Sequence, residues 1–140
     1  AIIDEEKGWT VSGGWDSGVG EGADINGNNG GKLTYEVDLT EKDLATLTLG
    51  ARTFVRPNET NSKMYVSVKL ADGTETRVLA SNYEYADGVD TILIDNSDPK
   101  FDQRNEFVFD LSAFADKGVV TITIGADAGT HCVITDIQLS

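Results

Sequence analysis

The sequence contains only one cysteine, Cys132, and one histidine, His131, among its 140 residues. A single cysteine excludes a disulfide within the chain and a zinc site made of several cysteines. The two residues are adjacent, and neighbours on a strand point to opposite faces, so they do not form a nucleophile and its base. We expect Cys132 to be a small buried core residue, as free cysteine usually is.

Long apolar runs and positive charge are also scarce. No stretch approaches the roughly eighteen apolar residues of a membrane-spanning helix. Eleven Lys and Arg residues stand against 24 Asp and Glu residues, which gives a formal net charge of −13. This charge repels phosphate backbones and anionic lipids, which argues against nucleic acid and membranes as partners. Neutral ligands and cations remain open, and solubility alone is the simpler explanation of the charge.

Nothing in the sequence resembles a leader, because no basic segment is followed by an apolar one. The chain begins at Ala1, so we interpret it as a mature or excised fragment. Its length fits one domain, residues 1–140, which is large enough to be stable without a disulfide. Helix signals are limited to residues 40–43 and 111–115, each too short for a stable helix.

Alternation of apolar and polar residues, by contrast, runs through the chain. This period of two is typical of half-buried strands, and turn signals such as Asp72-Gly73 separate the runs. We predict eight to ten strands in an all-β, two-sheet antiparallel β-sandwich. A jelly roll is favoured over an immunoglobulin-like domain, because the Cys-Trp-Cys set of the latter is absent. The alternating runs are residues 33–39, 47–51, 64–70, 107–111 and 120–126.

Several of these runs look familiar when they are taken together in order. An Asp-Leu-Ser turn, residues 110–112, precedes a strand rich in Val, Ile and Thr, and an Asp-Ile-x-Leu strand, residues 136–139, closes the chain. This order resembles the galactose-binding-like β-sandwich of carbohydrate-binding modules attached to bacterial glycoside hydrolases. The segments that carry the resemblance are residues 31–39, 46–52, 109–115, 119–125 and 132–139.

The resemblance implies an extracellular, monomeric and non-catalytic module. Such a module would bind a polysaccharide or oligosaccharide and target a tethered catalytic domain to it. A shared fold does not fix function, so a second reading stays open: a structural or adhesive domain of a bacterial surface or cellulosome-type protein. Exposed rings and arginines in a cleft would favour the first reading, whereas buried rings and a smooth polar face would favour the second.

Catalysis is the third reading, and the sequence gives it little support. There is no serine elbow, phosphate loop or metal-type histidine pair. A glycosidase needs only two carboxylates about 5 to 9 Å apart, and acids are abundant, but no single pair stands out.

The candidate ligand-binding residues combine aromatic rings with arginine. Sugars present apolar CH faces that stack on rings, and hydroxyls that need hydrogen bonds. Trp15 stands among Gly, Ser and Asp, which is loop composition and predicts an exposed ring, whereas Trp9 shares its parity with Val11 and is expected in the core. Packing is the alternative role for Trp15.

Two tyrosines and two arginines complete this set. Tyr83 and Tyr85 would share one face of an extended segment and form a stacking platform, or else cover the core as edge residues. Arg52 continues the run 47–51 on the opposite face from its leucines, where its planar fork would suit paired hydroxyls. Arg56 follows four residues later. The alternative for Arg52 is a surface ion pair with one of the many acids.

The resemblance also implies a structural calcium ion where the first strand meets the last. The positions that fit are Asp4 or Glu6, a loop carbonyl near Gly31, and Asp136. The order Asp-Glu-Glu at residues 4–6 departs from the usual Glu-x-Glu opening. The alternative is that Asp136 satisfies a turn or faces water.

Overall fold

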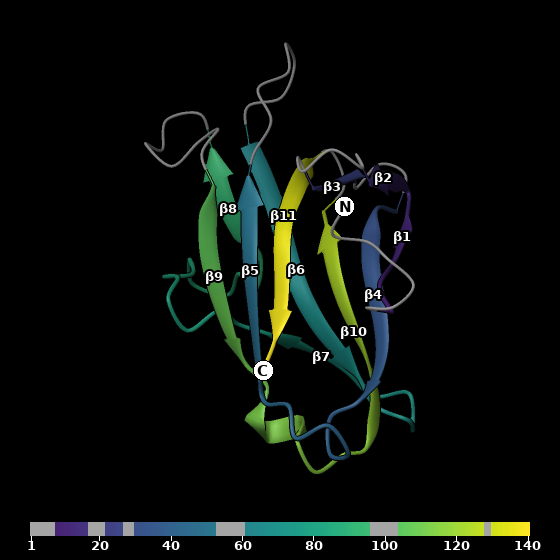
Figure 1. Cartoon of the computed structure of the whole chain (residues 1–140). Coiled ribbons are helices and arrows are strands. Elements are labelled where there is room, and N and C mark those ends of the chain that lie inside the picture. The colour runs from purple at the N-terminus through teal and green to yellow at the C-terminus, as the bar shows by residue number, and fades with distance from the viewer. Residues whose placement is uncertain (1–7, 17–21, 27–29, 53–60, 96–103, 128–129) are drawn as a thin grey trace.

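The structure is a computed structural model that describes residues 8–16, 22–26, 30–52, 61–95, 104–127 and 130–140 (Figure 1). Within these residues the chain forms eleven strands and one short 3-10 helix. No helix among them is long and apolar enough to cross a membrane. The elements in order are β1 (Thr10–Ser12), β2 (Gly14–Asp16), β3 (Ala23–Asn26), β4 (Lys32–Asp38), β5 (Thr46–Arg52), β6 (Asn61–Lys69), β7 (Glu75–Val78), β8 (Ile92–Asp95), β9 (Asn105–Asp110), η2 (Ser112–Phe114), β10 (Val119–Ala126) and β11 (His131–Leu139).

The strands form two sheets that pack face to face (Figure 1). The first sheet has the order β1-β4-β10-β6-β7, and β8 also pairs with β6. The second sheet has the order β2-β3-β11-β5-β9 and lies toward the viewer. Every strand pairing is antiparallel. The prediction of an all-β, two-sheet antiparallel sandwich of jelly-roll type is confirmed, and the described residues form eleven strands where eight to ten were expected.

The alternation seen in the sequence sets which side chains enter the core. In the second sheet, Leu47 and Leu49 of β5 pair with Phe109 and Phe107 of β9, and all four side chains are buried. Cys132 is 2% exposed and belongs to the same core, as predicted. The first sheet contributes the buried side chains Leu33, Val37, Met64, Val66, Val68, Val120, Ile122 and Ile124.

One flank of the sandwich is only partly paired. Strand β1 covers residues 32–34 of β4, and β3 covers residues 131–134 of β11. Beyond these points, residues 35–38 and 136–139 pair on one side only, with β10 and β5, among the strands that the structure describes. On this flank each sheet therefore ends in a strand half that has a described neighbouring strand on one side only.

Candidate functional site

A row of four residues crosses the outer face of the second sheet. Trp15 of β2 is in register with Asp24 of β3, Asp24 with Val133 of β11, and Val133 with Arg52 of β5. Residues directly opposite each other in an antiparallel pair share one face of the sheet. The neighbouring Ala51 is buried in the core, so Arg52 lies on the outer face, as the alternation predicted. Whether Arg52 contacts a ligand stays a prediction.

The middle of this row is shielded from water. Asp24 is 5% exposed and Val133 is 1% exposed, although both lie on the outer face. Arg52 at the end of the row is half-buried. A carboxylate is buried in proteins only where polar or charged groups compensate its lost hydration, and Asp24 does make such an interaction. The centre of the outer face therefore holds a buried carboxylate and is not a flat solvated surface.

A second row, one step along the same face, holds an arginine and two acids. Asp136 of β11 pairs with Gly50 of β5, and Gly50 pairs with Glu106 of β9. Arg104 donates from Nε to Asp136 Oδ2 and from Nη2 to Asp136 Oδ1, both at 2.9 Å. Its Nη2 also lies 3.8 Å from Glu106 Oε2. This fork-shaped pairing fixes the plane of the Arg104 guanidinium above the sheet.

Gly50 makes room for that pair. A Cβ atom on residue 50 would lie 2.5 Å from Asp136 Oδ2, 2.5 Å from Thr135 Oγ1 and 2.8 Å from Arg104 Nε. A glycine inside a strand often marks a close approach of other groups to the backbone. Sequence reasoning named Asp136 of this row, as a calcium position, but overlooked Arg104 and Gly50; the isolated glycine in the run 47–51 was a signal that could have found the close approach.

The surroundings of Asp136 do not fit a calcium ligand. Both of its carboxylate oxygens accept hydrogen bonds from Arg104, whereas calcium sites are built from several oxygens around the ion. Within the described part of the chain, no three acidic, histidine or cysteine side chains are grouped as metal ligands would be. Asp4 and Glu6 lie outside the described residues, so calcium stays a prediction.

Tyr83 and Tyr85 turn toward the core and toward backbone groups. Their rings meet edge to face, with centroids 4.7 Å apart and planes at 85°, so they do not form one flat platform. The Tyr85 hydroxyl accepts a hydrogen bond of 2.7 Å from Ala80 N–H. The Tyr83 hydroxyl bonds both the N–H and the carbonyl of Leu93 at 3.1 Å. This geometry favours core-covering tyrosines, although Tyr83 also lines a cavity of about 270 Å³ with Val89 and Leu93.

The two tryptophans and Arg56 complete the predicted set. Trp9 is 6% exposed and packs in the core, as predicted. Trp15 does not lie in a loop, as its surrounding residues suggested; it lies on the short strand β2, because that segment pairs with β3. Arg56 lies outside the described residues. Of the predicted ligand-binding residues that the structure describes, Trp15 and Arg52 are therefore the two that share one row.

Comparisons with known proteins agree with this architecture. No protein-family model and no curated protein matches the chain. Solved structures do, over 96–99% of its length. The first is described as a carbohydrate-binding module of the β-sandwich superfamily with promiscuous specificity (13% identity, TM-score 0.55), and the chain spans 57% of it. The second is the xylan-binding module CBM15 (12% identity, TM-score 0.57), of which the chain spans 92%.

A third match is a xylanase from Cellvibrio japonicus in complex with xylopentaose, at 12% identity and a TM-score of 0.54. The chain spans 28% of that protein. At such identities the likeness is one of fold. The fold is a β-sandwich like that of the two carbohydrate-binding modules among these structures, in agreement with the fold that the sequence resemblance implied.

Proposed function

We propose that this chain is a non-catalytic carbohydrate-binding module that holds a polysaccharide across the outer face of its second sheet. The observation that supports this most is the row Trp15–Asp24–Val133–Arg52, in which an aromatic position and an arginine stand at the two ends and a buried acid lies between them. The adjacent Arg104–Asp136 pair extends the polar groups along the same face.

The residue types in these two rows match the chemistry of a sugar chain. An indole stacks on the CH face of a pyranose, and we assign that role to Trp15. The guanidinium of Arg52 carries five N–H donors in a fixed plane, a geometry that suits the paired hydroxyls of a sugar. Carboxylates such as Asp136 accept hydrogen bonds from hydroxyls. A neutral polymer is favoured because the protein itself carries a net charge of −13.

We further propose that the module is extracellular and monomeric, and that it targets a tethered catalytic domain to its polymer. One structural neighbour is described as a xylan-binding module and another as a xylanase in complex with xylopentaose, so xylan is the first polymer to test. The neighbours that are described as binding modules support a non-catalytic role for this chain.

The test is affinity gel electrophoresis of the folded domain in gels that contain soluble xylan, glucan, mannan or galactan. We expect one polymer class to retard the domain, and Arg52→Ala to abolish most of the retardation. Arg77→Ala is the matched control, because Arg77 lies on the other sheet, stacked 3.6 Å over the Tyr65 ring. Equal retardation of the two variants would contradict the assignment of the outer face, and no retardation by any polymer would favour the adhesive reading.

A further inference from the structure

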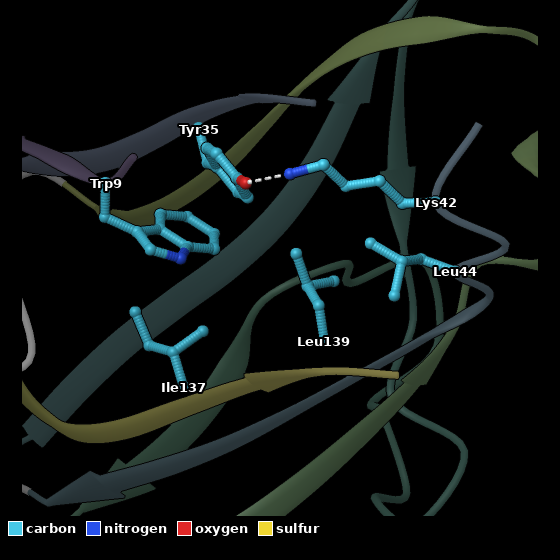
Figure 2. Close-up of a pocket in the computed structure, with 6 residues that line it drawn as sticks. All are labelled: Trp9, Tyr35, Lys42, Leu44, Ile137 and Leu139. Atoms are coloured by element: carbon cyan, nitrogen blue, oxygen red, sulfur yellow. Dashed lines mark hydrogen bonds between the residues drawn. The ribbon is translucent and has the colours of Figure 1, made fainter. Parts of the chain in front are cut away.

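A second cavity opens on the partly paired flank, away from the outer face. It encloses about 240 Å³, and Figure 2 shows the six residues that line it. Ile137 and Leu139 of β11 are in register with the buried Leu49 and Leu47, so they face between the sheets. The lining residues are Trp9, Tyr35, Lys42, Leu44, Ile137 and Leu139.

The cavity lies where both sheets lack a neighbouring strand. Tyr35 belongs to the half of β4 beyond β1, and Ile137 belongs to the half of β11 beyond β3. The slot between them therefore enters the sandwich from its side, whereas the row that ends at Arg52 lies on the outer surface of the second sheet. The two places are separated by the thickness of that sheet.

Two aromatic rings form one wall of the cavity. The centroids of Trp9 and Tyr35 lie 5.1 Å apart, with their planes at 43°. Gly8 sets the position of the Tyr35 ring, because a Cβ atom there would overlap the ring. In Figure 2 the aliphatic side chains of Ile137, Leu139 and Leu44 lie across from these rings. A ligand in the cavity would therefore contact apolar surface on several sides.

Lys42 and Trp9 add polar donors to the lining of the same cavity. Lys42 Nζ donates a hydrogen bond of 3.4 Å to the Tyr35 hydroxyl, which is a long contact that leaves the ammonium free to bind another acceptor. No other hydrogen bond joins the six residues in Figure 2, so the Trp9 indole N–H is not bonded to another of them. An ammonium and an indole N–H both need acceptors, which hydroxyl and ether oxygens provide.

We propose that this flank cavity binds one neutral pyranose ring, as a free sugar or as the end unit of an oligosaccharide. Its volume is below the roughly 300–1,000 Å³ of pockets that bury drug-sized ligands, which restricts the ligand to a single ring. The rings and aliphatic walls match a CH face, and Lys42 and Trp9 match its oxygens. Asp38, Glu41 and Asp43 surround Lys42 in the chain, so an anionic sugar is disfavoured.

This inference rests on the proposed carbohydrate-binding function and adds a second site of different specificity. The outer face would hold the interior of a polymer, and the flank cavity would hold a single unit. The two tryptophans make the sites separately observable, since Trp9 lines the cavity and Trp15 belongs to the outer row. Each indole N–H gives its own signal in a two-dimensional nitrogen–proton spectrum.

The experiment titrates the domain with xylose, glucose, galactose and mannose, and separately with the retarding polysaccharide. We expect one monosaccharide to shift the Trp9 indole signal and leave that of Trp15 in place, while the polysaccharide shifts that of Trp15. Lys42→Met keeps the aliphatic stem but removes the ammonium, and Tyr35→Phe keeps the ring. Lys42→Met should weaken monosaccharide binding at least about threefold, as loss of a hydrogen bond does. Tyr35→Phe should also weaken it, because it removes the hydroxyl that positions the Lys42 ammonium. Arg52→Ala should leave it unchanged.

Two results would overturn this inference. One is that none of the four monosaccharides shifts the Trp9 signal, even at high concentration. The other is a Trp9 shift that occurs with the same affinity in Lys42→Met and Tyr35→Phe as in the wild type. If the polysaccharide still shifts Trp15 in that case, the proposed function stands and only the flank cavity is refuted. If the polysaccharide shifts neither signal while a monosaccharide shifts Trp9, the outer face is refuted and the cavity stands.

Discussion

Arg104 holds the carboxylate of Asp136 with two hydrogen bonds of 2.9 Å, and the bare backbone of Gly50 lies directly beneath the pair. Asp136 belongs to β11 and Gly50 to β5, and Arg104 directly precedes β9. They fix a charged group on the outer face at a defined position. The same face carries the row that ends in Arg52, so the pair bounds the surface on which we place the ligand.

Gly50→Ala tests this arrangement. The added Cβ atom would overlap the Asp136 and Thr135 side chains, so we expect the pair to be displaced and the free energy of unfolding to fall by about 1–3 kcal/mol. Thr48→Ala, on the same face of β5, is the control because it removes atoms and adds none. Urea denaturation of both variants measures the effect. A Gly50→Ala protein as stable as the wild type would show that the outer face adapts without cost.

Asp136→Asn tests whether the Asp136 carboxylate serves in the ion pair with Arg104 or as a calcium ligand. The pair is half exposed, so we expect its loss to change the free energy of unfolding by about 1 kcal/mol or less. Since the Asp136 oxygens are bound by Arg104, a chelator should shift the melting temperature equally in wild type and variant. A chelator shift that is present in the wild type and absent from Asp136→Asn would make Asp136 a calcium ligand after all.

Trp15→Ala tests the aromatic part of the proposed site. Loss of a stacked ring costs on the order of 1 kcal/mol or more, so polysaccharide affinity should fall about tenfold. Isothermal titration calorimetry with the retarding polymer measures this change. Circular dichroism provides the folding control, because β2 is a short edge strand whose pairing with β3 must survive the substitution. A folded variant with wild-type affinity would remove Trp15 from the site.

Tyr85 should titrate at unusually high pH. Burial raises the pKa of its phenol above the ordinary value of about 10, and the hydrogen bond from Ala80 N–H opposes this only in part. A raised pKa for an acid means that the folded state favours the neutral form. Its contribution to stability is therefore complete below the unfolded pKa and is lost as pH rises through the folded pKa.

The measurement is tyrosinate absorbance against pH, with Tyr85→Phe as the variant that lacks the late-titrating group. Tyr85→Phe should also lower the free energy of unfolding at neutral pH by about 1–3 kcal/mol, because Ala80 N–H loses its acceptor. The wild-type curve should contain one tyrosine that titrates later than the others and is missing from the Tyr85→Phe curve. If the missing tyrosine instead titrates at the ordinary pKa, the packing of Tyr85 against the core is not as described.

The fold could be predicted from the sequence because it depends on local alternation. The runs at residues 33–39, 47–51 and 120–126 each place leucine, isoleucine or valine on one face, and that face became the core. The Asp72-Gly73 turn joins β6 and β7 as expected, with Gly73 at a φ of 90°. These features need only neighbouring residues to specify them.

The site could be predicted less well from the sequence, because it depends on pairings between strands that are distant in the chain. Arg52 could be placed on the outer face from its parity alone, but its row with Trp15 exists only because β2, β3, β11 and β5 are adjacent. Arg104 and Asp136 meet across 32 positions of sequence. Tyr83 and Tyr85 do not form a flat platform, because the segment between β7 and β8 is not extended and the spacing of two does not make the rings parallel; ligand contact by either ring stays a prediction.

The most direct test of the central claim compares Arg52→Ala with Arg77→Ala in binding to the polysaccharide that retards the wild-type domain. Calorimetry of the two folded variants measures how much affinity is lost when one arginine is removed from each sheet. The account predicts that Arg52→Ala loses about tenfold or more in affinity, the equivalent of about 1.4 kcal/mol, while Arg77→Ala binds as the wild type does. Unchanged binding by Arg52→Ala, or an equal loss in both variants, would contradict it.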